Sequence, residues 1–320
     1  MELDKIRCGY WHWIKSNATS NADHWKVTTV KLQKAVKKQV IGLLFASPAI
    51  VYIAVFFLYP FLLTVYLSFT EYPLIAPPKF VGLDNFVTIF TRDATFGDSI
   101  YATVIYSVGF CLGIWILTPA LSLFFNNKFK GRSFYVVIFM IAAMLGVVPS
   151  AMAWKVVLHP SLGIFNKLFF YSWGYTGQVD WFSSVNMAMP GMIMVTLASG
   201  IPFYSIYLIG ALGGIPNHYY EVAKIGGASL FQRLRYVVLP SIKPIYLFVI
   251  VTSLISSFQM VSWFFLLTNG GPVNATRVLS LYIYNSAFYY YKFGYAAALT
   301  LVLLAISSIL CYFALKVMSK

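Results

Sequence analysis

Six long stretches of the chain contain no charged side chain. The first, between Lys38 and Glu71, has 32 uncharged residues, and the five later stretches have 29, 22, 40, 33 and 23. A helix needs about 20 apolar residues to cross the hydrocarbon core of a bilayer, so each stretch has room for one span. The pattern predicts six transmembrane helices, at about 43–68, 100–125, 134–156, 187–212, 245–268 and 293–315.

Basic residues gather in alternate segments between these spans. With a cytoplasmic N-terminus, 17 lysines and arginines fall in the inside segments and five in the outside segments, with Lys155 at an outer membrane boundary. Cytoplasmic loops carry the excess of lysine and arginine in membrane proteins. We therefore expect both termini to be cytoplasmic.

Composition excludes several classes of protein. Apolar residues make up 60% of the chain and charged residues 10%, and the mean hydropathy is +0.76, whereas soluble domains have about 45–50% and about 25%. A soluble enzyme, a disordered protein and a secreted disulfide scaffold are therefore excluded. The expected architecture is an all-α integral membrane domain at 40–318, preceded by a basic cytoplasmic segment at 1–39.

The net charge of +14 reflects this topology, because the excess lies in the cytoplasmic segments. Anionic membrane lipid is the expected partner, and nucleic acid is not. In the N-terminal segment, Trp11, Trp13 and Trp25 stand among lysines, which favours a segment on the membrane surface. A solvated tail is the open alternative.

Sequence signatures of catalysis and of direct nucleotide binding are absent. The chain has no G-x-x-x-x-G-K-[ST] loop, no H-E-x-x-H and no G-x-S-x-G. Its four histidines and three cysteines are scattered, so no metal site and no cofactor is expected in this chain. The predicted spans hold no Asp or Glu, which weakens a proton-coupled transporter. A secondary transporter that couples a small polar solute to another ion stays open.

The predicted spans carry neutral polar side chains beside aromatic ones. Gln259 and Trp263 are four residues apart and are expected on one helix face. A glutamine in the membrane needs a wet interior or a partner, and neutral hydrogen-bonding groups beside an aromatic ring suit a sugar. For the serines and threonines, the alternative is helix packing through small residues.

The segment at about 214–244 predicts a short helix–turn–helix on the cytoplasmic side. Asn217 is the expected N-cap of its first helix, with Glu221 near the positive end. Two glycines, 226 and 227, break that helix, and Ser229 with Gln232 forms an S-x-x-Q capping box for the second. Pro240 is expected to stop the second helix. An amphipathic connector at the membrane surface is the alternative.

This segment resembles the EAA coupling loop of ABC importer permeases, in which E-A-A-x-x-x-G-A is followed by I-x-L-P. Val222 replaces the first alanine of that pattern, and Gly226 replaces a frequent aspartate. The residues that match the coupling pattern are Glu221, Val222, Ala223, Gly227, Ala228, Leu239 and Pro240.

Three further segments resemble sugar permeases of the MalF type. FVGLDNF at 80–86 is similar to their outer loop F-x-G-L-x-N-F, and HPSLG at 159–163, with Asn166, is similar to their N-P-x-x-G-x-x-N element. LTNGGP at 267–272, with Thr276 and Tyr282, matches their turn after the fifth span. The chain is thus identified as a member of the binding-protein-dependent carbohydrate permeases over about 42–318.

That resemblance implies a six-helix permease of the type I ABC importer fold in a bacterial inner membrane. The permease would form a heterodimer with a second permease and stand on two ATPase subunits that bind ATP and Mg. An extracytoplasmic solute-binding protein would deliver the substrate. This chain would be a transporter subunit and not an enzyme, because hydrolysis belongs to the ATPase.

The resemblance also implies a substrate, an oligosaccharide or related glycan. Lys155, His159, Arg277 and Lys292 in outer segments keep open an acidic one, such as an alginate or pectin fragment, although a lysine there can simply reach the lipid headgroups. The residues expected along the substrate path are Thr196, Ser199, Gly200, Ser257, Gln259, Met260 and Trp263.

Overall fold

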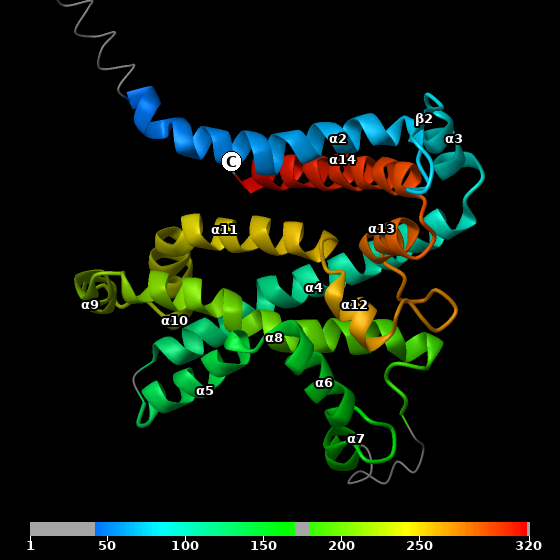
Figure 1. The fold of residues 1–320 in the computed structure, drawn as a ribbon. Coiled ribbons are helices and arrows are strands. Elements are labelled where there is room, and N and C mark those ends of the chain that lie inside the picture. Colours follow the sequence, from blue (N-terminus) through cyan, green and yellow to red (C-terminus); the bar gives the residue numbers. More distant parts are fainter. Residues whose placement is uncertain (1–41, 128, 170–178, 319–320) are drawn as a thin grey trace, which may run out of the picture. The chain divides into compact units, whose positions relative to one another are not determined.

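The computed structural model of the chain describes residues 42–127, 129–169 and 179–318. Most of these residues are helical (Figure 1). The chain divides into two units, Met1–Leu63 and Thr64–Lys320, and each is described by itself. The basic segment expected at 1–39 lies outside the described residues.

Within the described residues, five helices are long and apolar enough to cross a membrane, and they correspond to the first, second, fourth, fifth and sixth predicted spans. They are Gly42–Ser68, which contains η1 (Ala54–Leu58) and α2 (Tyr59–Ser68); α4 (Ala94–Asn126); α8 (Val185–Gly213); Leu230–Phe258; and α14 (Phe293–Met318).

The third predicted span, expected as one helix over 134–156, forms two shorter helices instead. These are α5 (Arg132–Met144) and α6 (Val147–Val157), and the chain is extended at Leu145 and Gly146 between them. Pro149 explains the break, because its ring would collide with the carbonyl of Leu145 in a continuous helix, whereas a proline fits in a first turn. The glycine before α6 favours the same break.

The expectation that Pro240 stops a helix is wrong. Instead, α10 (Leu230–Arg233), η3 (Leu234–Val238) and α11 (Leu239–Phe258) form one continuous helix through Pro240. A π-helical turn is wider than an α-helical one, and it moves away the carbonyls that the proline ring would strike. The hydroxyl of Ser241 donates to the carbonyl of Val237 (2.6 Å) and satisfies part of the disturbed backbone. In Gly42–Ser68, η1 precedes Pro60 in the same way.

The fifth span also ends earlier than expected. Its helix stops at Phe258, and a separate short helix, α12 (Ser262–Leu267), follows. The break turns Trp263 and Phe264 into the core, where the Phe264 ring meets that of Tyr106 edge to face at 4.8 Å. Burial of these two large rings outweighs the local preference for a continuous helix.

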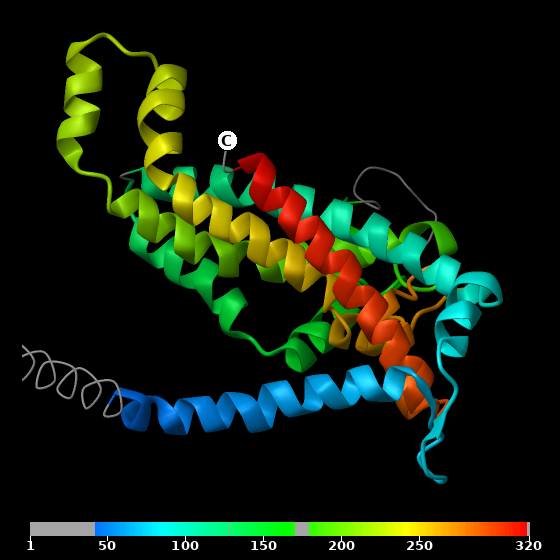
Figure 2. The ribbon, with the colours of Figure 1, turned by 90° about the horizontal axis from the view of Figure 1, so that it is seen from above.

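The core of the second unit lies between α4 and α8, which pack along each other (Figures 1 and 2). Gly109 and Gly113 of α4 let the helices approach, because a Cβ at either position would lie within 2.6 Å of the side chain of Ile193 or Leu197. Small residues four apart are a common device for packing membrane helices.

At one end of this unit the chain forms a cap of short elements. They are β1 (Thr70–Glu71) and β2 (Lys79–Phe80), an antiparallel pair, with α3 (Asp84–Thr91) and α13 (Leu279–Phe288). The first turn of α14 joins the cap, because the N–H of Phe293 donates to the carbonyl of Tyr72 (2.9 Å). Near the opposite end lie α9 (Asn217–Ile225) and α10 (Figure 1), while α7 (Ile164–Phe169) follows α6.

Gly294 is the tightest backbone contact of the cap and generates a prediction. An ideal Cβ there would lie 1.9 Å from the carbonyl oxygen of Thr70, so Gly294→Ala must push two backbones apart. We expect a loss of about 1–3 kcal/mol in stability, seen as a lower midpoint of thermal unfolding in detergent. Gly97→Ala in α4 is the control, since nothing lies within 4 Å of its Cβ. Equal midpoints for the two variants would contradict the contact.

Candidate functional site

The predicted coupling segment forms a hairpin of two helical arms. Its first arm is α9, and its second arm is the start of the helix Leu230–Phe258. Figure 2 shows this hairpin standing beyond the long helices of the unit. Its root is held by buried apolar contacts among Leu212, Ile215, Val238 and Ile242. The hairpin therefore projects from a packed base.

The turn of the hairpin is set by Gly227. Its φ of +69° is a left-handed conformation, which glycine adopts without the strain of a side chain. The N–H of Ala228 donates to the carbonyl of Ala223 (2.9 Å), and that of Gly227 to Lys224 (3.0 Å). These two bonds form the closing motif common at helix ends. The expected capping box of Ser229 and Gln232 is present in full.

Two details of α9 differ from the expectation. Pro216 is its N-cap and Asn217 its first residue, and the Asn217 side chain makes no capping bond. Glu221 lies outside the first turn, so the helix dipole does not hold its carboxylate as proposed. A proline before a helix fixes the chain direction without a side-chain acceptor, and this shifts the helix start by one residue.

The hairpin presents apolar side chains to the outside. No residue of α9 is buried; Val222 is 66% and Ile225 88% exposed, and Leu230 and Phe231 of the second arm are also exposed. Ala223 and Ala228 are half-buried, whereas Leu239 and Pro240 are exposed. Grouped apolar side chains on a surface mark a protein interface.

The expected substrate-path residues divide by exposure. Thr196, Ser257 and Trp263 are buried, and the two hydroxyls donate to carbonyls of their own helices, Met192 (2.8 Å) and Leu254 (2.7 Å). Ser199, Gly200 and Met260 are half-buried. Gln259 alone of this set is exposed.

Gln259 and Trp263 do not share a helix face. Gln259 ends α11, Trp263 belongs to α12, and the break between them separates the side chains into exposed and buried positions. Gly200 faces Phe110 and Ile114 of α4, where a Cβ would come within 3.3 Å of both side chains. In this structure Gly200 is thus a helix-packing residue.

Other polar and aromatic side chains of the spans do meet across helices. The indole N–H of Trp115 donates to the hydroxyl of Ser253 (3.0 Å), which joins α4 to α11. The hydroxyl of Tyr204 donates to that of Ser256 (3.2 Å), which joins α8 to α11. Hydrogen bonds between side chains take the place of water in such an interior.

Each of the three further motifs that resemble sugar permeases stabilises a local fold through one side chain. The amide of Asn85 donates to the carbonyls of Ser68 (2.8 Å) and Thr70 (3.0 Å), which ties α3 to the cap. The buried Asn166 amide donates to the carbonyl of Pro160 (3.1 Å), in the loop between α6 and α7. The buried hydroxyl of Thr276 donates to the carbonyl of Gly271 (2.6 Å), inside the turn after α12.

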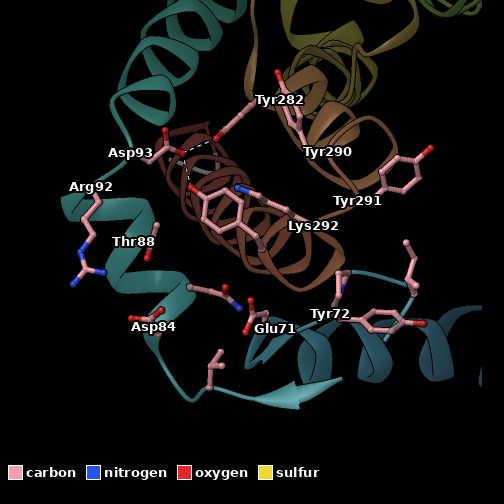
Figure 3. A pocket seen from close by; sticks show the side chains of 15 residues that line it. Glu71, Tyr72, Asp84, Thr88, Arg92, Asp93, Tyr282, Tyr290, Tyr291 and Lys292 are labelled. Atoms are coloured by element: carbon pink, nitrogen blue, oxygen red, sulfur yellow. Dashed lines mark hydrogen bonds between the residues drawn. The ribbon is translucent and has the colours of Figure 1, made fainter. Parts of the chain in front are cut away.

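A network around Asp93 was missed by sequence reasoning. Its carboxylate accepts from the hydroxyls of Tyr282 (2.6 Å) and Tyr295, and from the backbone N–H groups of Thr95 (2.9 Å) and Phe96 (3.3 Å) (Figure 3). It therefore caps α4 and joins it to α13 and α14. The N-cap role could have been inferred from an Asp just before an apolar run, but the tyrosines lie almost two hundred residues away along the chain.

Asp93 lies in the wall of a cavity of about 710 Å³ at the cap (Figure 3). Burial alone would raise the pKa of this carboxyl, but its four hydrogen bonds outweigh burial and hold the pKa below its ordinary value. Around it the cavity collects tyrosines and charged groups: Tyr72, Tyr282, Tyr290, Tyr291, Tyr295, Arg92, Lys292, Glu71 and Asp84.

Residues 109–318 match the family described as binding-protein-dependent transport system inner membrane component. Over 301 residues the chain is 30% identical to the probable ABC transporter permease protein YesP of Bacillus subtilis (strain 168), which covers 91% of this chain and 94% of that protein. The chain belongs to this permease family. It is therefore a multi-pass membrane protein and a transporter component, and not an enzyme.

Two more comparisons agree with the permease fold. The trehalose/maltose transport system permease protein MalF of Thermococcus litoralis is 29% identical over 255 residues, which is 79% of this permease and 84% of that protein. A crystal structure of a bacterial ABC transporter involved in the import of the acidic polysaccharide alginate has a TM-score of 0.77 at 23% identity, covering 90% of this permease and 98% of that chain. The predicted type I ABC importer permease fold is confirmed.

The Asp93 network predicts an acid-dependent stability. Because its folded pKa is lowered, the carboxylate stabilises the permease above the unfolded pKa of about 3.9, and the effect is lost as pH falls through the folded pKa. We expect Asp93→Asn to cost about 1–3 kcal/mol, measured as a lower unfolding midpoint in detergent, by the same amount from about pH 5 to 8.

Asp98→Asn is the matched control, because Asp98 is an exposed residue on the first turns of α4. Its midpoint should equal that of the unchanged permease. A difference between Asp93→Asn and the unchanged permease that disappears between pH 7 and pH 5 would mean that the Asp93 pKa is raised, against the geometry.

Proposed function

We propose that this permease is one transmembrane subunit of an ATP-driven ABC importer, and that it forms the translocation path together with a second permease. The observation that carries the proposal is the hairpin of α9 and α10, with exposed apolar side chains on a packed root. Such a surface is suited to a protein partner or to the membrane surface. The sequence match to the coupling loop favours an ATPase as that partner.

The remaining partners follow from the same proposal. Two ATPase subunits bind ATP and Mg and perform the hydrolysis, and this chain binds neither. The family description, a binding-protein-dependent transport system, supports delivery of substrate by an extracytoplasmic solute-binding protein. An ion-coupled secondary transporter is not favoured, because the relatives are ABC permeases.

A rigid helix would carry motion from the ATPase into the membrane. The helix Leu230–Phe258 starts at the turn of the hairpin and continues without interruption into the span. At 1.5 Å per residue its 29 residues reach about 43 Å. Movement of the hairpin tip would therefore tilt α11 as one body, as rigid switching between two states requires.

We further propose the membrane topology. Six spans, with α5 and α6 together forming the third, cross the inner membrane of a bacterium, and both termini are cytoplasmic. The positive-inside distribution supports this orientation. The hairpin then lies in the cytoplasm and the cap on the outer side.

The proposed substrate is an oligosaccharide. The trehalose/maltose relative supports a sugar, and the neutral polar groups near the α11–α12 break could hydrogen-bond its hydroxyls. Gln259, exposed at the end of α11, is the first candidate for such a contact. Thr196, Ser199, Ser257, Met260 and Trp263 remain proposed path residues for another state of the transporter.

The coupling turn can be tested with neighbouring glycines. Gly227→Val should abolish uptake into proteoliposomes and co-purification of the ATPase, because a side chain at φ +69° is strained by about 1–3 kcal/mol and misaligns the arms. Gly226→Ala is the control, since its φ is −73° and its Cβ would meet nothing nearer than 3.5 Å. Transport at the unchanged rate by Gly227→Val would refute coupling through this turn.

The charge of the docking helix can be tested separately. Glu221 is exposed on α9 and can accept charge-assisted bonds from a basic group on the ATPase. Glu221→Lys should reduce ATPase co-purification and uptake while the two permeases still assemble. Unchanged ATPase binding by this variant would exclude a contact at Glu221.

Labelling can test the topology. In a chain with Cys8, Cys111 and Cys311 replaced by serine, Ile75→Cys should react with a membrane-impermeant maleimide in intact spheroplasts, because Ile75 is 96% exposed in the cap. Val222→Cys, in the hairpin, should react only after lysis. The reverse pattern would invert the proposed orientation.

A further inference from the structure

A smaller chamber of about 210 Å³ adjoins the large cavity of the cap. The two share Tyr282, Tyr290, Lys292 and Tyr295 in their walls. The chamber adds Thr95, Ser286 and Arg277, which do not line the large cavity. The chamber therefore differs from the large cavity in the polar and charged groups that line it.

The chamber wall carries two positive charges and no negative one. Arg277 comes from the loop before α13, and Lys292 from the loop before α14. Among the described residues neither side chain has an ion-pair partner, and the buried Nε of Arg277 has no hydrogen-bond acceptor. An unsatisfied, buried guanidinium N–H calls for an acceptor from outside the chain.

The carboxylate of Asp93, in the wall of the adjoining cavity, is already engaged in hydrogen bonds. Asp93 already accepts four hydrogen bonds, two of them from Tyr282 and Tyr295 in the wall between the cavities. Figure 3 shows the Lys292 side chain extending into the cavity toward this network. The two cations are therefore available to a ligand.

The backbone of Arg277 is fixed within the turn after α12. Its backbone N–H donates to the carbonyl of Asn274 (3.0 Å), and Gly270 lies beside its side chain, because a Cβ there would be 3.5 Å from the Nε. The neighbouring Thr276 is buried and bonded within that turn. A guanidinium has a planar set of donors that matches the geometry of a carboxylate.

The large cavity has a different character. It adds the rings of Tyr72 and Tyr291, and its charged groups of both signs include Glu71, Asp84 and Arg92. Aromatic faces and hydrogen-bonding groups suit neutral sugar rings, and a volume of about 710 Å³ is typical of small-molecule sites. The carboxylates of this cavity would repel a second negative charge.

We propose that the chamber binds the carboxylate of a uronic-acid residue in an oligosaccharide, through Arg277 and Lys292, while neutral sugar residues lie in the tyrosine-lined cavity. The ligand class is an oligosaccharide with one acidic end and an otherwise neutral chain. This inference rests on the proposed function for its sugar, and it adds a binding site at the cap, away from the α11–α12 break.

Binding to the assembled transporter in nanodiscs, without solute-binding protein or ATP, tests the site. The probes are xylotriose capped with one glucuronate and the methyl ester of the same compound, with calorimetry as readout. The acid should bind at least about tenfold more tightly than the ester, as expected for one charge-assisted contact. Trigalacturonate should bind more weakly than the capped xylotriose.

Substitutions of Lys292 and Arg277 test whether these two cations bind the carboxylate. Lys292→Gln and Arg277→Gln should each weaken acid binding about tenfold and leave ester binding unchanged, while Lys292→Arg should retain acid binding. Because Lys292 is exposed, its variants keep the test valid should Arg277→Gln fail to fold. Lys155→Gln, an exposed cation on α6, is the control and should bind as the unchanged transporter does.

Equal binding of acid and ester, or unchanged acid binding by Lys292→Gln, would overturn the proposal. The proposal would also be overturned if the Lys292 and Arg277 variants weakened only the docking of the solute-binding protein. The two cations would then bind a carboxylate of that protein and not one of the oligosaccharide. The importer function is measured in a separate experiment, as the stimulation of ATPase activity by neutral oligosaccharides in the presence of the solute-binding protein. That stimulation is measured on the unchanged transporter, so either hypothesis can fail alone.

Discussion

The lack of water in a bilayer interior is the constraint on which this structure depends. Each backbone N–H and C=O in a span must find its partner inside the chain, so the spans are helical, and even prolines must be absorbed without opening the helix. The π turns before Pro60 and Pro240 do this by widening one turn. Pro119 and Pro202 lie inside α4 and α8 without a break, whereas before Pro149 the helix breaks at Leu145 and Gly146. The same constraint explains why the hydroxyls of Thr196 and Ser257 bond to carbonyls of their own helices.

The features that sequence predicts well are those set by local chemistry. Charge-free runs locate the long helices, because span length depends on bilayer thickness alone. The capping box of Ser229 and the left-handed Gly227 follow from neighbouring residues. Helix interruptions were less predictable: Pro149 breaks a helix, whereas Pro240 does not, and the break after Phe258 has no proline or glycine. That break is set by burial of Trp263 and Phe264 in a core built from distant segments. The Asp93 network was missed for the same reason, since its tyrosines come from the other end of the chain.

The two ends of the second unit are stabilised by different kinds of contact. The cap is fixed by directional contacts of polar groups: Asn85 to backbone carbonyls, Asp93 to two tyrosines, and the close approach of Gly294 to Thr70. Hydrogen bonds weaken steeply when their donor and acceptor move out of line. The cap is therefore suited to keep one conformation. The hairpin instead has an apolar root and a tip without buried residues in α9. Apolar packing tolerates small reorientation, and an exposed apolar tip gains stability only when a partner covers it.

The position of the α11–α12 break connects these two ends. The helix that starts at the hairpin ends at Phe258, and after three intervening residues α12 begins, anchored by buried Trp263, Phe264 and Leu267. A rigid helix that moves against an anchored one must change its geometry at the joint between them, which is Gln259, Met260 and Val261. These residues lack regular helical bonding, so they can alter their backbone angles at low cost. Gln259 and Met260 also belong to the proposed substrate path. In the proposed importer, motion of the ATPase would therefore reach the substrate where the backbone is least constrained, and the exposed amide of Gln259 would turn with it.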